Sequence, residues 1–281
     1  MILFNEIKGW YCENQGYQHY LDNHLQIDGW EIEDLGESST SSMHVYGLHR
    51  DLDTKKPIIY LQSGIHGNEF PPVFFSRRFA EWISRPEKAP GDTKHLFEYL
   101  KNKYAFYWIP IANPYGYEHQ TRDNEFMNIN VDFQDETQKE TLIIKKLNER
   151  IKPVISIDCH NWERDNSTPC HKMAIYQDGY RNKFFHREIS NNALKSLSLI
   201  SNENVMEYPF NDHGGRHFHV WSGAQKGING QYVVSWLIET SRMRTPEVQT
   251  REGINAMLVF CLQSDVWLFK SIQNPTLIDI M

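Results

Sequence analysis

A histidine and a glutamate follow an apolar run at a spacing that suits metal binding. His66 and Glu69 stand three positions apart, shortly after residues 58–63 and the turn glycine Gly64. Catalytic zinc is commonly held by two histidines and one carboxylate, with a fourth position left for water. Because H-x-x-E also occurs by chance, the pair predicts a zinc site only if the chain supplies a third ligand and a base.

Two later apolar runs supply the missing groups. One ends at His160 and the other at Glu239, each where a buried strand would reach the surface. Strands of an open α/β sheet present their carboxyl ends along one edge, so these side chains are expected to meet the first pair there. His160 would complete the ligand set, and Glu239 would be the base that a hydrolytic metal site needs. Asp158 points to the same face of its strand as His160 and could orient this ligand.

The spacing of apolar residues predicts strands that alternate with helices. Strands are expected at residues 43–48, 58–63, 104–111, 154–160 and 232–239, and helices at residues 73–83, 182–199 and 247–272. Residues 112–117 have the composition of a turn, and the first forty residues show no clear periodicity. The alternation, without an internal repeat or a linker, predicts a single α/β domain over residues 1–281 with a largely parallel or mixed sheet.

Composition limits the classes of function. The chain has 281 residues, of which 40% are hydrophobic and 23% charged, and its formal net charge is -7. These values are ordinary for a soluble globular protein, and an acidic chain without a Lys/Arg cluster is not expected to bind nucleic acid. The N-terminal residues lack the features of a signal peptide, and no stretch is apolar enough to span a bilayer. We therefore expect a cytoplasmic protein that does not bind membranes.

The ordered motifs of the chain resemble those of the zinc carboxypeptidases. The motifs are Gly64-Ile65-His66-Gly67-Asn68-Glu69, Asn113-Pro114-Tyr115-Gly116-Tyr117, Asn130-Val131-Asp132-Phe133, Asp158-Cys159-His160-Asn161-Trp162 and Ile238-Glu239-Thr240. The resemblance covers residues 55–255, and the related succinylglutamate desuccinylases and aspartoacylases share the H-G-N-E and D-x-H elements. It implies an α/β fold in which a mixed, mostly parallel sheet of about eight strands is sandwiched between helices.

The resemblance also implies roles for individual residues. By it, His66, Glu69 and His160 bind Zn²⁺, one ion per chain, with a second metal left open. Glu239 is then the general base that activates the metal-bound water, and Arg122 polarises the carbonyl of the scissile bond. The activity implied is that of a zinc metallopeptidase acting on a small peptide.

The sequence departs from these families where they bind the substrate carboxylate. The motif that ends at Phe133 is usually followed by an Asn-Arg pair, but Gln134-Asp135 stands here. A guanidinium suits a carboxylate, whereas Asp135 would repel one. Either the substrate carries an amine or is neutral at that place, or another cation substitutes. The candidate cations are Arg164, Arg216 and Arg242.

Residues 212–221 form a second unusual stretch, rich in glycine and histidine. The zinc carboxypeptidases place a mobile tyrosine near this distance before the base, and His217 and His219 stand close to that offset. One alternative is a polar surface loop hinged at its glycines. The other is a lid that closes on the substrate, with a histidine that donates to the leaving amine or joins a second metal site.

Two other functions stay open beside the peptidase. An N-acyl amino-acid amidohydrolase of the desuccinylase or aspartoacylase type is compatible with the H-G-N-E motif, although residues 113–117 favour the peptidase branch. A metal-binding protein that has lost catalysis is the other alternative, and the presence of both Arg122 and Glu239 argues against it. The sequence does not indicate the oligomeric state.

Overall fold

The computed structural model describes residues 15–40, 42–162, 175–176, 191–193, 195–197, 216–242 and 244–273. These residues contain a seven-stranded sheet of order β1-β2-β4-β3-β5-β7-β6. The strands are β1 (Glu31–Glu37), β2 (His44–Arg50), β3 (Ile58–Gln62), β4 (Ala105–Ile109), β5 (Ile155–Trp162), β6 (Ile175–Tyr176) and β7 (Val234–Ser241). The four strands β4, β3, β5 and β7 run parallel, and β1, β2 and β6 are antiparallel to their neighbours. The predicted α/β class with a mixed sheet is confirmed, with seven strands in the described residues where about eight were expected.

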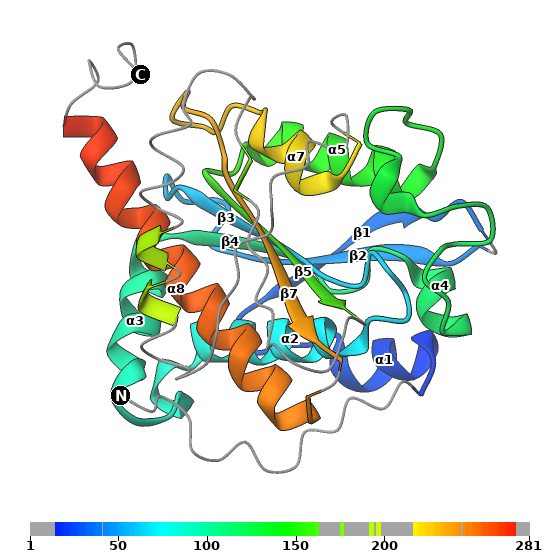
Figure 1. Cartoon of the computed structure of the whole chain (residues 1–281), viewed down its shortest axis with the longest axis horizontal. Coiled ribbons are helices and arrows are strands. Elements are labelled where there is room, and N and C mark those ends of the chain that lie inside the picture. The colour runs from blue at the N-terminus through cyan, green and yellow to red at the C-terminus, as the bar shows by residue number, and fades with distance from the viewer. Residues whose placement is uncertain are drawn as a thin grey trace.

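Helices cover both faces of this sheet (Figure 1). They are α1 (Tyr17–His24), α2 (Phe70–Ser84), α3 (Lys94–Lys103), α4 (Pro114–His119), α5 (Lys139–Ile151), α7 (Phe218–Gly223) and α8 (Pro246–Gln273), with 3-10 turns η1 (Pro86–Lys88), η2 (Gly91–Thr93) and η3 (Ile129–Val131). Helices α5 and α7 lie on one face, and α2, α3 and α8 lie on the other. None of the helices in the described ranges combines the length and the apolarity that a membrane crossing requires.

The central strands are buried on both sides. All five residues of β3 and all five of β4 are buried, which is why these strands are almost entirely apolar in sequence. Alternate residues serve different faces: Ile59 and Leu61 belong to the core under α2 and α8, whereas Ile58 and Tyr60 belong to the core under α5 and α7. The ends of these strands are therefore held firmly, and polar side chains just beyond them have fixed positions.

Most of the expected elements occur close to their predicted bounds. The helix expected at residues 73–83 is α2, with prolines in its first turn, and the helix expected at residues 247–272 is α8. Of the helix expected at residues 182–199, residues 191–193 and 195–197 are helical and the others lie outside the described residues.

The turn expected at residues 112–117 is wrong, because helix α4 occupies most of it. The side chain of Asn113 accepts the backbone N–H of Gly116 at 2.9 Å, and Pro114 takes the first helical position. An N-cap asparagine followed by proline is a favourable helix start. The helix α1 and strand β1 were not predicted.

Candidate metal centre

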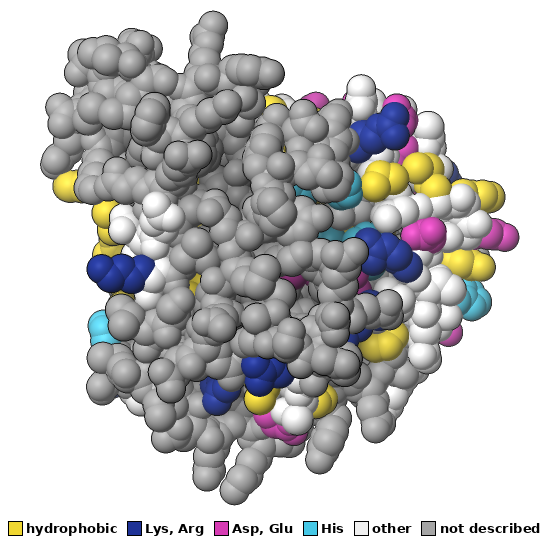
Figure 2. All heavy atoms as spheres, in the orientation of Figure 1, with side chains coloured by type: hydrophobic (Ala, Val, Ile, Leu, Met, Phe, Trp, Pro, Cys, Tyr) yellow, Lys and Arg dark blue, Asp and Glu magenta, His cyan; other side chains and the backbone are white. Residues whose placement is uncertain are grey.

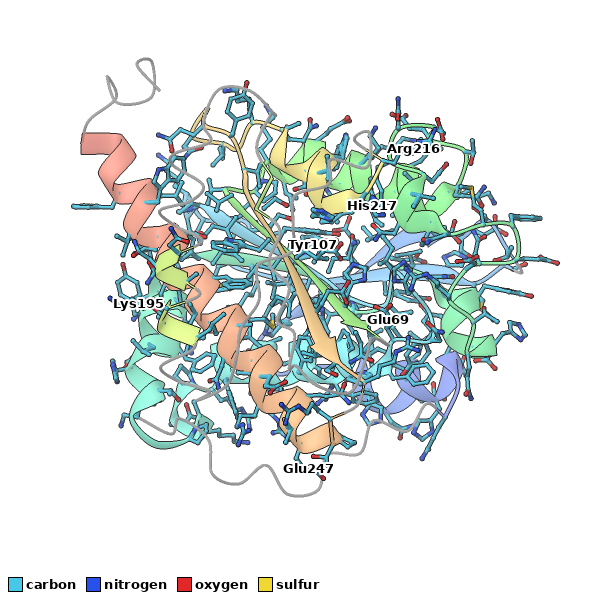
Figure 3. All side chains as sticks on the ribbon, viewed as in Figure 1. Glu69, Tyr107, Lys195, Arg216, His217 and Glu247 are labelled. Carbon is cyan, nitrogen blue, oxygen red and sulfur yellow. The ribbon has the colours of Figure 1, made fainter. Side chains whose placement is uncertain are left out.

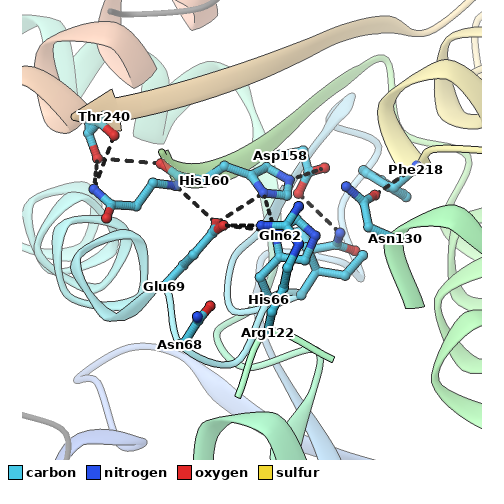
Figure 4. A network of polar contacts seen from close by, with 12 residues as sticks. Gln62, His66, Asn68, Glu69, Arg122, Asn130, Asp158, His160, Phe218 and Thr240 are labelled. Carbon is cyan, nitrogen blue, oxygen red and sulfur yellow. Dashed lines mark hydrogen bonds and ion pairs between the residues drawn. The ribbon is translucent and has the colours of Figure 1, made fainter. Parts of the chain in front are cut away.

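Three buried side chains converge near the carboxyl ends of β3 and β5. The potential ligand atoms of His66, Glu69 and His160 all lie within 4.8 Å of one another. Nδ1 of His66 is 2.8 Å from Glu69 Oε1, and Nδ1 of His160 is 3.1 Å from Glu69 Oε2. The two Nδ1 atoms are 3.2 Å apart. The structure thus brings together the three residues that the sequence predicts as ligands (Figure 4).

Glycines shape the turn that carries the first two of these side chains. Gly64 follows β3 with a φ of 62°, in the left-handed region that glycine adopts readily. Gly67 packs so closely on α4 that an added Cβ would lie 1.9 Å from the carbonyl carbon of Gly116. The chain then enters α2 directly after Glu69. Figure 3 shows Glu69 near the carboxyl end of β5, where this turn delivers it.

The third side chain comes from the sheet itself. His160 lies on β5, which pairs with β3 on one side and with β7 on the other. Its Nε2 is 2.9 Å from Oδ2 of Asp158, the contact expected from their shared strand face. A carboxylate behind a histidine fixes the ring so that the other nitrogen faces a metal.

The two histidines differ in charge. Burial lowers the pKa of His160, but the charges and hydrogen bonds of Asp158 and Glu69 outweigh it and raise this pKa well above its ordinary value. Burial lowers the pKa of His66, and Glu69 does not offset the effect. Without a metal, the surroundings of His160 therefore favour its protonated form, whereas burial of His66 favours its neutral form.

The donor set fits zinc. Two imidazole nitrogens and a carboxylate are the ligands that zinc takes in hydrolases. Two Nδ1 atoms only 3.2 Å apart share a proton or a cation, and a divalent cation would satisfy both of them and Glu69 together. Nε2 of His66 is buried and finds no hydrogen-bond partner in the part of the chain that is described.

Glu239 lies on the strand next to His160. The two residues are direct partners in the pairing of β5 with β7. Oε2 of Glu239 is buried without a hydrogen-bond partner among the described residues. Burial raises the pKa of Glu239 to about 8, and the negative charge of Glu69 adds to the effect. Such a carboxylate can take up and release a proton near neutral pH.

Two arginines approach Glu69. Arg122 places Nη1 3.3 Å from Glu69 Oε1, and its side chain is 54% exposed. Arg242 places Nη2 3.9 Å from the same oxygen. The Nε of Arg242 donates to Asn161 Oδ1 at 3.0 Å, and its Nη2 donates to Asn68 Oδ1 at 3.2 Å. In the space-filling view, Lys/Arg and His side chains lie side by side on the face turned to the viewer (Figure 2).

Asn68 and Asn161 are site residues that the sequence reasoning did not single out. Asn68 directly precedes Glu69 and Asn161 directly follows His160, and this adjacency to the candidate ligands could have indicated them. Asn161 also donates its backbone N–H to Glu69 Oε2 at 2.9 Å and its side-chain amide to Thr240 Oγ1 at 2.9 Å. It therefore connects the carboxylate ligand to both β7 and Arg242.

The segment that departs from the family pattern lies at the surface. Gln134 and Asp135 are exposed, whereas Asp132 is fully buried. Asp132 accepts the backbone N–H groups of Thr137 and Gln138 at 3.0 and 2.9 Å, which organises the turn before α5. Of the other substitute cations, Arg216 is exposed and Arg164 lies outside the described residues.

The surface-loop alternative for residues 212–221 is wrong for the part that forms α7. Phe218 and His219 are buried, and the ring of Phe218 packs 5.3 Å from that of Phe133. The backbone N–H of Phe218 donates to Asn130 Oδ1 at 3.2 Å. Figure 3 shows Arg216 and His217 at the start of this helix. Residues 212–215 lie outside the described residues, so the lid stays a prediction.

Comparisons with known proteins find relatives by fold. No family model matches the chain, and no curated protein matches it. The metallo-carboxypeptidase of Burkholderia cenocepacia matches with a TM-score of 0.71 at 15% identity, over 89% of this chain and 69% of that chain. The metallo-carboxypeptidase of Pseudomonas aeruginosa, solved with (2-guanidinoethylmercapto)succinic acid, matches with a TM-score of 0.64 at 16% identity, over 89% and 68%.

A eukaryotic enzyme matches in the same way. Carboxypeptidase A of Helicoverpa armigera has a TM-score of 0.62 at 14% identity, over 88% of this chain and 71% of that chain. Structural similarity at identities this low shows a shared fold and does not show a shared reaction. The chain thus has the fold of the metallo-carboxypeptidases, as its ordered motifs predict.

Proposed function

We propose that this protein is a zinc-dependent hydrolase that cleaves an amide or peptide bond. The observation that carries the proposal is the buried convergence of His66, Glu69 and His160 on a metallo-carboxypeptidase fold. Glu239 pairs with His160 in the sheet and Arg122 contacts Glu69, so a base and a guanidinium accompany the candidate ligands.

The chemistry follows from the positions of these groups. Zinc held by the three ligands would supply a Lewis acid that lowers the pKa of water and polarises a carbonyl. Glu239 would accept the proton of the attacking water and pass it to the leaving nitrogen, a transfer that its raised pKa suits. Arg122 would donate to the oxygen on which negative charge develops.

Arg242 is the best-supported candidate for binding an anionic part of the substrate. It lies 3.9 Å from Glu69 and is held in place by Asn68 and Asn161. Together with Arg122 it places two positive charges beside the candidate ligands. Guanidinium groups bind carboxylates well, which favours substrates with a free carboxylate, such as short peptides or N-acyl amino acids.

The second candidate is an N-acyl amino-acid amidohydrolase. The sequence shares the D-x-H element with desuccinylases and aspartoacylases. In this element, the side chain of Asp158 contacts that of His160. The helical residues 114–117, by contrast, belong to the motif that favours a peptidase. The two candidates use the same hydrolytic groups and differ in the acyl side of the substrate.

A metal analysis combined with a substrate survey tests the proposal. The purified protein should contain about one zinc per chain, and His66→Ala should contain almost none, because two ligands hold catalytic zinc poorly. Short peptides and N-acyl amino acids, assayed in parallel, should identify the substrate class. Full zinc occupancy in His66→Ala would refute the ligand assignment, and a zinc-loaded protein inert on both libraries would refute the hydrolase.

A further inference from the structure

Behind His160, buried polar side chains form a chain that leads away from the candidate metal site (Figure 4). Asp158 binds His160 through Oδ2. Its other oxygen, Oδ1, accepts from Nε2 of Gln62 at 3.2 Å. Oε1 of Gln62 accepts from the hydroxyl of Tyr60 at 2.8 Å. All four residues are at most 1% exposed, so the chain runs from a ligand into the core without meeting solvent.

The pairing of two neighbouring strands brings these side chains together. β3 and β5 are parallel, and Gln62 is the direct partner of Asp158. Tyr60 and Gln62 stand two residues apart on β3, as Asp158 and His160 do on β5, so each pair points to one face of the sheet. A shift of register by one residue would turn Gln62 away from Asp158. The pairing of β3 with β5 at the centre of the sheet therefore fixes this row of hydrogen-bonded side chains.

Asp158 and Tyr60 together orient the amide of Gln62. The ring of Tyr60 packs 5.6 Å from that of Phe218 on α7, which holds the hydroxyl in place. Burial raises the pKa of Tyr60 well above its ordinary value, and the charge of Asp158 adds to this, so the hydroxyl keeps its proton and donates it. Because the carboxylate of Asp158 only accepts, Gln62 turns its NH₂ group to Asp158, and its carbonyl oxygen accepts from the hydroxyl of Tyr60.

We propose that Gln62 and Tyr60 are positioning residues for His160, because they hold Asp158 where it directs Nδ1 of His160 toward the metal. The inference rests on the proposed zinc site and extends it to two residues of an apolar strand. Carboxylates behind metal-binding histidines tune metal affinity. Here the carboxylate is itself oriented by a donor, which also offsets part of the cost of burying its charge.

Comparison with His66, the other proposed histidine ligand, shows what these hydrogen bonds add to the placement of His160. Nε2 of His66 is buried and has no hydrogen-bond partner within the described ranges. His66 thus contacts Glu69 through Nδ1 alone, whereas the ring of His160 contacts carboxylates through both nitrogens. Loosening the hydrogen bonds of His160 is expected to weaken metal binding, because the described residues give Nε2 of His66 no similar support.

Gln62→Leu tests the inference, since it preserves size and removes both hydrogen bonds of the amide. Its zinc dissociation constant, measured by competition with a chelator, should rise about tenfold. The visible spectrum of the Co²⁺-substituted protein should also change, because the imidazole ligand is less well oriented. Gln138→Leu is the matched control: it removes a buried amide that bonds to Asn124, and it should leave both measurements as in the wild type.

Tyr60→Phe gives a second test that preserves the packing of the ring. It removes one hydroxyl and should weaken zinc binding about threefold, as a more distant member of the chain. Tyr107→Phe removes the hydroxyl of another fully buried tyrosine, which bonds to Glu33, and should change nothing. If Gln62→Leu does not fold, this pair of variants decides.

The outcomes separate the inference from the proposed function. Wild-type zinc affinity in both Gln62→Leu and Tyr60→Phe would overturn the positioning role and leave the zinc hydrolase intact. Equal weakening in the control variants would also overturn it, because the effect would then reflect general stability. A wild-type protein that binds no zinc would overturn both.

Discussion

Two glutamates of the candidate site, Glu69 and Glu239, have opposite surroundings. Glu69 lies between two imidazoles, accepts the backbone N–H of Asn161 and contacts Arg122. Burial raises its pKa, but the two imidazoles, His66 foremost, hold the pKa below the ordinary value. Glu239 has a buried oxygen for which the described residues provide no hydrogen bond, and burial raises its pKa to about 8.

This difference suits Glu69 to the proposed role of metal ligand and Glu239 to the proposed role of base. A carboxylate that stays ionised at every ordinary pH is suited to hold a cation. One whose pKa lies near neutrality is suited to move a proton during hydrolysis. The same residue type therefore serves two purposes, because the number of donors around it differs. Replacing each of the two glutamates tests the assignment.

Replacing each glutamate by glutamine is expected to have the largest effect. Glu239→Gln should keep its zinc and lose about a hundredfold to ten-thousandfold in kcat, because general-base catalysis contributes on that order. Glu69→Gln should lose most of its zinc, because a neutral amide is a poor ligand. Elemental analysis and rates on the best substrate check both. Glu239→Gln without zinc, or Glu69→Gln with full zinc, would reverse the two roles.

The stability of the metal-free protein should depend on pH in opposite ways for the two groups. The raised pKa of Glu239 means that its protonated form is favoured in the fold. Its contribution is fully present below the unfolded value of about 4.5 and is lost as the pH rises through about 8. The lowered pKa of Glu69 means that its contribution is present above about 4.5 and is lost as the pH falls further.

Glutamine variants again report these contributions. Since one pKa unit corresponds to about 1.4 kcal/mol, metal-free Glu239→Gln should be more stable than the wild type by at least ~1 kcal/mol at about pH 9, and nearly equal at about pH 5. Glu69→Gln should be less stable than the wild type at neutral pH. Urea unfolding at a series of pH values measures both. Parallel curves for Glu239→Gln and the wild type would show that Glu239 titrates normally.

The buried part of this architecture could be predicted from sequence because its pattern is local. All residues of β3 and β4 are buried, so both strands are mostly apolar, and His66 and Glu69 follow shortly after the end of β3. Strand β1 has no fully buried residue and carries several acidic ones, so it lacked both alternation and an apolar run. Helix α4 contains a proline and a glycine, which have the composition of a turn unless the cap from Asn113 is foreseen.

The supporting groups of the site could not be predicted, because their contacts join distant parts of the chain. Arg242 meets Asn68 across 174 positions, and Gln62 meets Asp158 across 96. Gln62 and Tyr60 also belong to a buried strand, so in the sequence they look like ordinary members of the core. Only the register of β3 with β5 reveals the polar contact. Ligand types can be recognised from spacing, but the groups that orient them depend on the pairing of strands.

Metal binding should release a proton, and His160 should be its source. The pKa of His160 is raised well above its ordinary value, mainly by Asp158, against the opposing effect of burial, while that of His66 is lowered. At neutral pH zinc must therefore displace about one proton from the site, so zinc affinity should rise with pH. Calorimetry in buffers of different ionisation enthalpy measures the number of protons. Release that persists unchanged in His160→Ala would assign the proton to another group.

The smallest of the expected effects concern the two arginines near Glu69, which should differ in the kinetic constant that each one changes. Arg122 is expected to act on the developing charge, so Arg122→Gln should lower kcat. Arg242 is expected to bind an anionic group that is present before and during the reaction, so Arg242→Gln should raise KM about tenfold with little change in kcat. A substrate whose carboxylate is replaced by an amide should show no such increase. If Arg242→Gln instead lowers the zinc content, its bonds to Asn68 and Asn161 serve to hold the ligands, and the substrate carboxylate has another partner.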